Sequence, residues 1–340
     1  MHSNNTRYTV SIKCMTYNHA LYITDAMDGF SKQRTSFPYV AVIVDDASTD
    51  SNQKVILDYY YSHFNTDEVG VSWEEEDDYA RYFFSRHREN SNCYFVLFLL
   101  KKNQFGNPSK GEHIKEWVCN SDYVALCEGD DYWIDPLKIQ KEVDLLEKDP
   151  GLIAVVTNSK IVDKEGSTLT SKVANVVPEN REGRYSLHDY FKNVHHYPTA
   201  TVLYRNDHFS EVNRMKRHTK NRFLGDWTMW AILHSFGDFF YLDEVTSAYR
   251  INPTSMTHSV DRVERAKANM TICQSLSEVL PAEYSPYLKK AGWMYFSVFM
   301  AYRKERKWFK MISSLLVCFF RYPAYTLKRL IRLVQGIDKK

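Results

Sequence analysis

Three carboxylates within four residues, Glu128, Asp130 and Asp131, form the group in this sequence whose chemistry is easiest to infer. They repel one another at neutral pH, and a bound cation would relieve that repulsion. Carboxylate oxygens with few other ligands suit Mg²⁺ or Mn²⁺ that is shared with substrate phosphates. Gly129 between them lets the backbone turn tightly. The group therefore predicts a divalent metal site, against the alternative of a solvated acidic turn.

A second acidic pair, Asp45 and Asp46, directly follows an apolar run over residues 39–44. A carboxylate at this position can bind a ligand, or it can cap and shape the turn that leads into the next helix. Both interpretations stay open for Asp45. Asp46 is better placed to accept hydrogen bonds from a base or ribose, so we expect it to contact a nucleotide.

Asp226 is a third candidate, within the sequence Leu-Gly-Asp-Trp. A carboxylate flanked by aromatic side chains can hold a raised pKa and act as a general base. An N-cap of the apolar helix that follows explains the residue equally well, and the two roles can coexist. His258 could be a ligand, although a lone histidine more often has a surface or structural role.

The rest of the sequence indicates which elements would position these residues. The expected strands cover residues 8–15, 39–44, 94–100, 123–127 and 152–157, and the expected helices cover residues 20–30, 52–64, 111–120 and 136–148. This alternation predicts an α/β fold, with an open, mostly parallel, Rossmann-like sheet flanked by helices. Ligands bind beyond the carboxyl ends of such strands, and both acidic groups follow strands at that edge.

Two stretches depart from the alternation. Residues 65–92 are acidic first and basic later, which we interpret as an insertion that carries a solvent-facing helix. From about residue 260 onward the pattern is helical. We therefore expect a catalytic domain over residues 1–258 and a helical C-terminal region over residues 259–340.

The composition limits the function classes. The 340 residues carry a formal net charge of +2, whereas a general nucleic-acid binder is usually far more basic. The six cysteines form no Cys-x-x-Cys pair, so we expect neither a zinc nor a disulfide framework. The N-terminal segment has no apolar signal region, and no uncharged apolar run reaches the ~20 residues of a membrane span. We expect a cytoplasmic protein that does not bind nucleic acid.

Taken together, these segments resemble the family 2 glycosyltransferases, which are inverting enzymes of GT-A-type fold. The resemblance rests on the order and spacing of SIKCMTYNHALYI, VIVDDASTD, YVALCEGDDYWIDPLKIQKEVDLLEKDP, GDWTMW and YRINPTS, over roughly residues 8–258. It implies hexosyl transfer from a nucleotide-sugar donor, which we expect to be UDP-linked. The acceptor would be a saccharide or lipid-linked saccharide in cell-surface polysaccharide or lipopolysaccharide synthesis.

The resemblance also implies a role for each candidate residue near the nucleotide. Thr16, Tyr17 and Asn18 would line the base pocket, with Tyr17 against the ring. Asp46, together with Asp45, would hold the base or the ribose.

The remaining candidates match positions around the diphosphate and the acceptor. Asp130 and Asp131 match the Asp-x-Asp region that reaches the donor diphosphate and its Mg²⁺ or Mn²⁺. Glu128 stands where the family has Asp, which leaves open which oxygens contact the metal and which contact the donor. Asp226 matches the catalytic base. The positions that match diphosphate-contacting residues are Arg250 and Ser255, and His258 just beyond them would assist at the metal.

The last part of the chain suggests contact with a membrane. Basic residues lie on both sides of the apolar residues 311–320, a pattern typical of interfacial helices on an anionic bilayer. The aromatic residues that we expect at the headgroup boundary are Trp308, Phe309, Phe319, Phe320, Tyr322 and Tyr325. The alternative is a packed helical subdomain with a basic solvent face. We expect peripheral binding at the inner face of the cell membrane.

Two other functions stay open. A nucleotidyltransferase on a related fold would make nucleotide sugars rather than use them. Such enzymes usually carry a Gly-rich N-terminal loop, and residues 8–20 contain no glycine. A non-catalytic sugar-binding module would not need carboxylates clustered at two strand ends.

Overall fold

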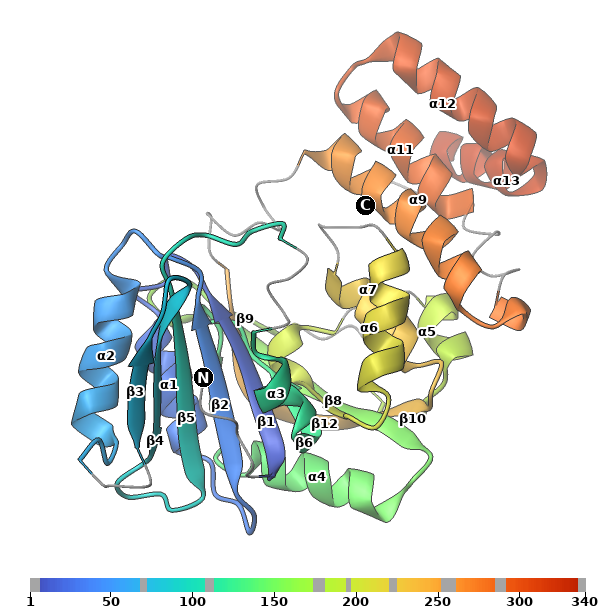
Figure 1. Cartoon of the computed structure of the whole chain (residues 1–340). Helices are drawn as coiled ribbons and strands as arrows, with labels where there is room; N and C mark the ends of the chain where they lie inside the picture. The colour runs from blue at the N-terminus through green and yellow to red at the C-terminus, as the bar shows by residue number, and fades with distance from the viewer. Residues whose placement is uncertain are drawn as a thin grey trace. The chain divides into compact units, whose positions relative to one another are not determined.

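The computed structural model describes residues 7–67, 72–107, 113–173, 181–193, 197–219, 225–251, 261–284 and 292–335. The chain divides into two compact units (Figure 1). The first unit comprises Met1–Ser186, His195–Phe209 and Phe236–Asn252, and the second comprises Leu187–Val194, Ser210–Ser235 and Pro253–Lys340.

The first unit contains a large mixed sheet in which the strands follow the order β10-β12-β8-β11-β6-β1-β2-β5-β4-β3. Its centre is parallel and consists of β6 (Ser121–Leu126), β1 (Tyr8–Thr16), β2 (Tyr39–Asp45) and β5 (Cys93–Leu100). Outside this centre, β12 (Asp238–Arg250) runs parallel to β8 (Leu152–Val162), while β11 (Val202–Arg205) joins β8 to β6 in antiparallel pairing. The predicted α/β fold is confirmed.

Helices cover both faces of the central strands. The first face packs against α1 (Ile23–Ser31), α2 (Asn52–His63) and α4 (Lys138–Lys148), whose apolar side chains share one core cluster with alternate residues of the strands. On the other face, the short helix α3 (Lys115–Cys119) brings Trp117 against Trp73 and Phe84. The backbone carbonyl oxygen of Trp117 also accepts a hydrogen bond from the hydroxyl of Ser11. Every residue of β2 is buried, which is why its sequence from Tyr39 to Val44 is apolar without alternation.

The strand register brings the carboxyl ends of the central strands together. Thr16 at the end of β1 lies opposite Asp45 at the end of β2, and Lys13 lies opposite Leu126 near the end of β6. The segments that leave these three strands therefore emerge at one edge of the sheet.

The predicted helix within residues 65–92 is wrong, because this stretch forms a β-hairpin. Strand β3 (Trp73–Glu76) pairs antiparallel with β4 (Ala80–Arg86), and β4 pairs with β5. Seven successive residues of β4 pair with β5, from Ala80 opposite Leu100 to Arg86 opposite Tyr94, as expected of a strand. The change from acidic to basic residues reflects two facing strands, with Glu76 opposite Arg81, rather than two ends of one helix. Asp77 closes the turn by accepting from the backbone N–H groups of Tyr79 and Ala80.

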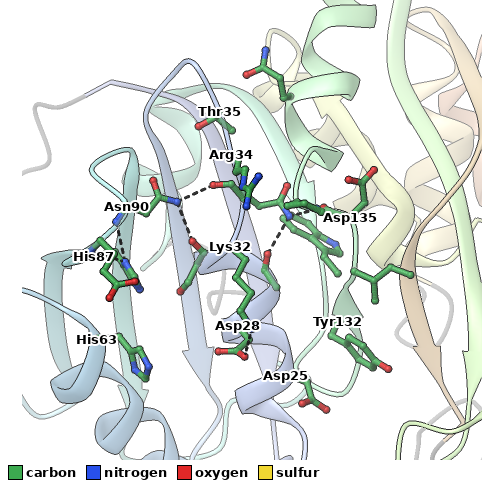
Figure 2. Close-up of a pocket in the computed structure, with 18 of the residues that line it drawn as sticks. Asp25, Asp28, Lys32, Arg34, Thr35, His63, His87, Asn90, Tyr132 and Asp135 are labelled. Carbon is green, nitrogen blue, oxygen red and sulfur yellow. Dashed lines mark hydrogen bonds and ion pairs between the residues drawn. The ribbon is translucent and has the colours of Figure 1, made fainter.

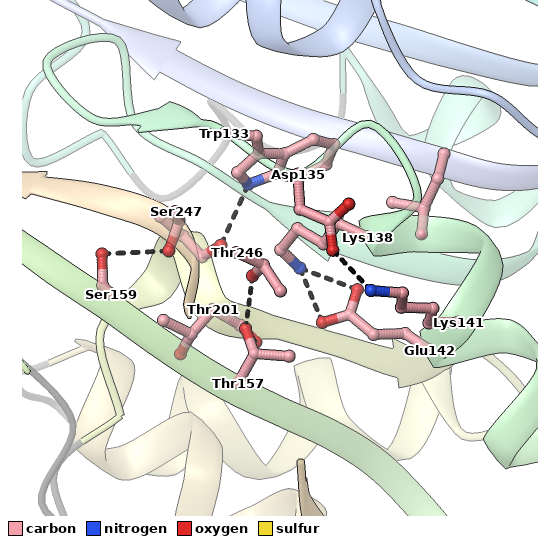
Figure 3. A network of polar contacts seen from close by, with 12 residues as sticks. Trp133, Asp135, Lys138, Lys141, Glu142, Thr157, Ser159, Thr201, Thr246 and Ser247 are labelled. Carbon is pink, nitrogen blue, oxygen red and sulfur yellow. Dashed lines mark hydrogen bonds and ion pairs between the residues drawn. The ribbon is translucent and has the colours of Figure 1, made fainter. Parts of the chain in front are cut away.

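A buried ion pair within α4 lies against the segment between β6 and α4 (Figure 3). Lys138 Nζ lies 2.7 Å from both carboxylate oxygens of Glu142 and 4.8 Å from the ring centre of Trp133. Burial raises the pKa of Glu142 to about 7 despite the neighbouring ammonium group. Trp133, in the short strand β7 (Tyr132–Trp133), also donates to the carbonyl oxygen of Ala200. These contacts anchor the chain directly after the acidic residues 128–131.

Polar contacts and short elements complete the first unit. Thr157 and Thr246 share a 2.6 Å hydrogen bond between β8 and β12, and Ser247 donates to Ser159 nearby (Figure 3). The remaining elements are β9 (Thr168–Val173), β10 (Gly183–Tyr185) and the 3₁₀ turn Thr199–Thr201.

The second unit is helical. Its elements are α5 (Leu187–Asn193), α6 (Phe209–His218, nearly all of it in this unit), α7 (Gly225–Leu233), α9 (Arg262–Val279), the 3₁₀ turn Ala282–Tyr284, α11 (Gly292–Lys304), α12 (Trp308–Arg321) and α13 (Pro323–Val334). Helix α9 packs on α11 through Val263, Ala266, Val298, Ala301 and Tyr302. The predicted helical C-terminal segment is confirmed, and among the described residues no helix has the length and apolarity to cross a membrane.

Candidate functional site

The loops that follow β1, β2 and β6 are hydrogen-bonded to one another. The backbone N–H of Asp46 donates to the carbonyl oxygen of Thr16 at 3.0 Å, and that of Gly129 donates to Met15 at 3.0 Å. Both predicted acidic groups are therefore attached to the end of the same central strand, and the site can be described as one edge of the sheet.

Gly129 is required where the acidic loop crosses the end of β1. A Cβ atom at this position would lie 2.5 Å from Thr16 Oγ1 and 2.6 Å from Thr16 Cβ. Thr16 itself is buried and accepts a hydrogen bond from Asn52 Nδ2 at 3.0 Å, so it has little room to move. Close contact between Gly129 and Thr16 thus sets the position of the carboxylates around it.

Gly129→Ala is expected to lower the free energy of unfolding by about 1–3 kcal/mol, the usual cost of overpacking. Chemical denaturation would measure this loss. Gly225→Ala is the stability control, since a Cβ there has nothing within 4 Å and the residue is exposed in a helix. Unchanged stability of Gly129→Ala would show that this contact does not position the loop.

Asp45 shapes the turn between β2 and α2. Its side chain is fully buried and accepts hydrogen bonds from Ser48 N at 3.0 Å, Gln53 Nε2 at 2.7 Å and Asn52 Nδ2 at 2.8 Å, as well as from the Ser48 hydroxyl. The turn contains two non-glycine residues with positive φ, Ala47 and Ser51. The turn-forming role that the sequence left open is thus present, while a contact with a nucleotide stays a prediction.

Asp46 connects the first loop to the segment after β5. Its Oδ1 accepts from Gln104 N at 2.7 Å, and its carbonyl oxygen accepts from Asn103 Nδ2 at 2.9 Å. The sequence analysis did not single out Asn103 and Gln104. Their polar sequence directly after a buried strand was the signal that could have identified a further site loop.

Tyr17 and Asn18 lie where the chain leaves β1. Asn18 has φ +58° and bridges two loops, because its Oδ1 accepts from Thr49 N at 2.8 Å and its own N–H donates to Ser48 Oγ at 2.9 Å. Tyr17 is 44% exposed, so its ring is accessible from solvent. The predicted base-pocket residues are therefore adjacent to Asp46 in the hydrogen-bonded loops, with one accessible aromatic ring among them.

The three clustered carboxylates differ in burial. Asp131 is buried, whereas Glu128 and Asp130 are partly accessible. Burial raises the pKa of Asp131 well above its usual range, and the negative charges of Asp130 and Glu128 raise it further. One oxygen of Asp131 accepts from the backbone N–H of Arg250 at 2.8 Å. The cluster therefore holds repelling groups at close range, as expected of a site that binds a cation or another positive group.

Arg250 fixes the acidic loop from the end of β12. Its Nε donates to the carbonyl oxygen of Asp130 at 2.9 Å, and its Nη2 donates to Asp25 at 2.7 Å. The guanidinium lies between the rings of Tyr22 and Tyr132, 4.7 and 5.2 Å from their centres. These contacts hold the loop in place, and the predicted contact of Arg250 with a diphosphate stays a prediction.

His19 is a residue at this edge that the sequence analysis did not identify. Its Nε2 lies 3.8 Å from Asp130 Oδ2. Its Nδ1 is buried and has no hydrogen-bond partner among the described residues. The signal was its position two residues after Tyr17, in the loop that leaves β1. An imidazole beside Asp130 can bind a phosphate oxygen or a cation.

The described residues fit a cation that is shared with a ligand. They contain no group of three or more His, Cys, Asp or Glu side chains in an arrangement that could hold a metal by itself. Mg²⁺ with nucleotide substrates is commonly bound through one or two carboxylates plus phosphate oxygens. Asp130, partly accessible and beside His19, is the carboxylate best placed for this mode.

The other predicted residues lie elsewhere. Asp226 belongs to the second unit, where it is exposed in the first turn of α7. It follows Gly225, the first helical residue, and so lies inside the helix rather than at the N-cap position. Ser255 and His258 lie outside the described residues.

A cavity of about 1480 Å³ lies along α1 in the first unit (Figure 2). Charged and polar side chains line it, including Asp28, Lys32, His63, His87 and Asn90. The cavity contains none of the site residues predicted from the sequence. It adjoins the edge where the acidic loops meet, because Asp25 and Tyr132 line it and both contact Arg250.

Comparisons with known proteins agree with this fold. No protein-family profile matches the chain. Uncharacterized proteins of Mycobacterium tuberculosis and Mycobacterium bovis are 31% identical over 160 residues, a match that spans 46% of this chain and 37% of each relative. The relatives thus share a segment with this chain but give it no function.

Solved structures of similar fold bind nucleotide sugars. Staphylococcus aureus TarS in complex with UDP has a TM-score of 0.53 at 15% identity, covering 83% of this chain and 70% of TarS. A complex of TarS with UDP-GlcNAc has a TM-score of 0.53 at 14% identity, covering 90% of this chain and 89% of the TarS chain. The mannosyltransferase PcManGT from Pyrobaculum calidifontis, in complex with GDP-Man and Mn²⁺, has a TM-score of 0.52 at 11% identity, covering 98% of this chain and 83% of PcManGT. At these identities the likeness establishes the fold, which this chain shares with proteins that bind nucleotide sugars, a mannosyltransferase among them.

Proposed function

We propose that this chain is an inverting glycosyltransferase of the family 2 type, which transfers a hexosyl group from a UDP-linked sugar to a saccharide or lipid-linked saccharide. The observation that carries the proposal is the joining of both acidic loops to the end of β1 by backbone hydrogen bonds. In open α/β sheets this edge binds the ligand. The fold shared with TarS and PcManGT supports a nucleotide sugar as that ligand.

In the proposed donor site, the hydrogen-bonded loops that follow β1, β2 and β6 contact the donor along its length, from the base to the diphosphate. Tyr17 stacks on the base, and Asp46 accepts hydrogen bonds from the base or ribose. Asp130 faces the diphosphate together with Mg²⁺ or Mn²⁺, which would offset charge on the departing nucleoside diphosphate. Arg250, which donates to the backbone carbonyl oxygen of Asp130, and His19, which lies 3.8 Å from its carboxylate, add polar groups around this residue.

The remaining candidates complete the donor site in this proposal. Asp45 and Asn18 keep the base pocket in shape, since both bind Ser48. Asp131 and Glu128 lie beside Asp130, while Ser255 contacts the diphosphate and His258 assists at the metal. Their roles follow the resemblance between this sequence and the family.

The proposed reaction is a single displacement. Asp226 removes the proton from an acceptor hydroxyl while the oxygen of that hydroxyl attacks the anomeric carbon. The bond between that carbon and the diphosphate oxygen breaks on the opposite side, so configuration is inverted. The nucleoside diphosphate leaves with the electron pair, and no covalent enzyme intermediate forms. We place this reaction in cell-surface polysaccharide or lipopolysaccharide synthesis, at the cytoplasmic face of the membrane.

Incubation with a panel of nucleotide sugars, followed by mass spectrometry, tests the function. We expect slow hydrolysis of one UDP-sugar to UDP and free sugar, and faster UDP release once an acceptor is added. A nucleotidyltransferase would instead combine a sugar phosphate with a nucleoside triphosphate and release pyrophosphate. A non-catalytic module would bind sugar and leave every donor intact. Either of the last two outcomes would overturn the proposal.

A further inference from the structure

Helix α12 presents its apolar side to solvent. A neighbouring side of the helix packs on α11 and α13 through Met311, Leu315 and Cys318. The exposed apolar residues of α12 include Phe309 at 87% and Phe320 at 81% exposure, and the full set is Trp308, Phe309, Ile312, Leu316, Val317, Phe319 and Phe320. At about 100° per residue, all of these but Val317 fall within an arc of about 120°. A surface helix of a globular protein normally carries polar residues on this side.

Helix α13 repeats the arrangement. Leu330 and Leu333 point toward the core formed with α11 and α12, while Leu327, Ile331 and Val334 are exposed. The exposed basic residues Lys328 and Arg332 flank this second apolar stripe. The alternative considered for this region was a packed subdomain with a basic solvent face. The structure shows a packed subdomain whose solvent face is apolar and edged by basic residues.

We propose that the exposed faces of α12 and α13 form a docking surface for an anionic lipid bilayer. Between residues 303 and 335 the chain has nine Lys or Arg residues and one acidic residue, Glu305, which is already paired with Lys307. A second copy of this surface would bring like charges together. Anionic headgroups would instead complement them, and each basic residue near such a surface contributes about 1 kcal/mol.

The geometry favours a helix pair that lies in the plane of the interface. The 14 residues of α12 span about 21 Å, less than the ~30 Å hydrocarbon core of a bilayer. Trp308 and the exposed phenylalanines supply side chains that favour the headgroup boundary. The prediction that Tyr322 and Tyr325 join them is wrong, since both rings pack inward against the cluster around Phe296. This surface would bind lipid whatever reaction the first unit catalyses.

Vesicle flotation of the full chain tests the surface, with vesicles of phosphatidylcholine alone or mixed with phosphatidylglycerol. The wild type should float with the mixed vesicles, and less so as salt rises. Phe309→Ser/Phe320→Ser should lower the affinity at least about tenfold, since burial of a single Phe side chain contributes that much. Lys328→Glu/Arg332→Glu should weaken binding only where phosphatidylglycerol is present.

Leu169→Ser is the matched control, because it removes an exposed apolar residue of the first unit and should leave flotation unchanged. All substituted positions are exposed, so thermal unfolding of each variant should match the wild type. A wild type that fails to float at low salt overturns the proposal. So does a wild-type dimer in solution that Phe309→Ser/Phe320→Ser converts to monomer without any change in flotation, because the surface would then be a self-interface.

Discussion

Replacing Asp226 by asparagine is expected to lower turnover by on the order of 10²-fold or more, within the range measured for groups that transfer a proton in the transition state. Asparagine keeps the size and hydrogen-bonding capacity of the side chain but cannot accept the proton of the acceptor hydroxyl. The affinity for UDP-sugar should change little, because the proposed base acts on the acceptor. Steady-state kinetics with saturating donor would measure the loss in kcat.

A structural role predicts a different result for the same variant. Asp226 lies in the first turn of α7, where a negative charge stabilises a helix by about 0.3–1 kcal/mol. Glu211→Gln is the matched control, because it removes an exposed first-turn charge from α6 in the same unit. Both variants should lose similar, small amounts of stability, and only Asp226→Asn should lose turnover. Near-normal turnover of Asp226→Asn would leave Asp226 as a helix-terminal charge and remove it from the mechanism.

The central sheet could be predicted because its strands are buried on both faces. Such strands read as continuous apolar runs, and the turn residues that follow them are polar, so β1, β2, β5 and β6 were each identified to within about two residues. The parallel register then placed Asp46 and Asp130 at one edge without any further information. This part of the fold depends only on local patterns and on strand direction.

The rest depended on contacts that sequence patterns do not encode. Strands β3 and β4 carry charges on their exposed sides, so their composition resembles a solvated helix until the pairing partner β5 is known. The contacts of Arg250 with Asp25 and Asp130 join residues far apart in the chain. His19 gained its significance only when β1 and β6 were placed side by side, since its neighbour Asp130 comes from another loop.

Activity is expected to disappear in excess chelator and to return with Mg²⁺ or Mn²⁺. The reason is the electrostatic cost of the acidic cluster, in which buried Asp131 lies beside the charges of Glu128 and Asp130. A cation shared with the donor diphosphate would relieve this repulsion only when donor is bound. Calorimetric titration of UDP with and without Mg²⁺ would show the coupling directly, and full activity in excess chelator would contradict it.

Asp131→Asn separates this interpretation from a structural role of the cluster. The amide keeps an oxygen that can accept from Arg250 N and, like the protonated acid that burial favours, carries no charge beside Asp130 and Glu128, so stability should stay level or rise. The dependence of UDP affinity on Mg²⁺ should nevertheless weaken. Asp45→Asn provides the contrast in stability. Both Asp45 oxygens already accept hydrogen bonds from the chain, so the NH₂ group of an amide would face other donors. We expect this variant to lose about 1–3 kcal/mol of the free energy of unfolding. If a carboxylate stabilises the fold, its replacement by an amide lowers the stability of the protein. If it serves a ligand, the same replacement leaves the stability unchanged. Equal loss of stability in both variants, with the Mg²⁺ dependence unchanged, would assign Asp131 to the fold.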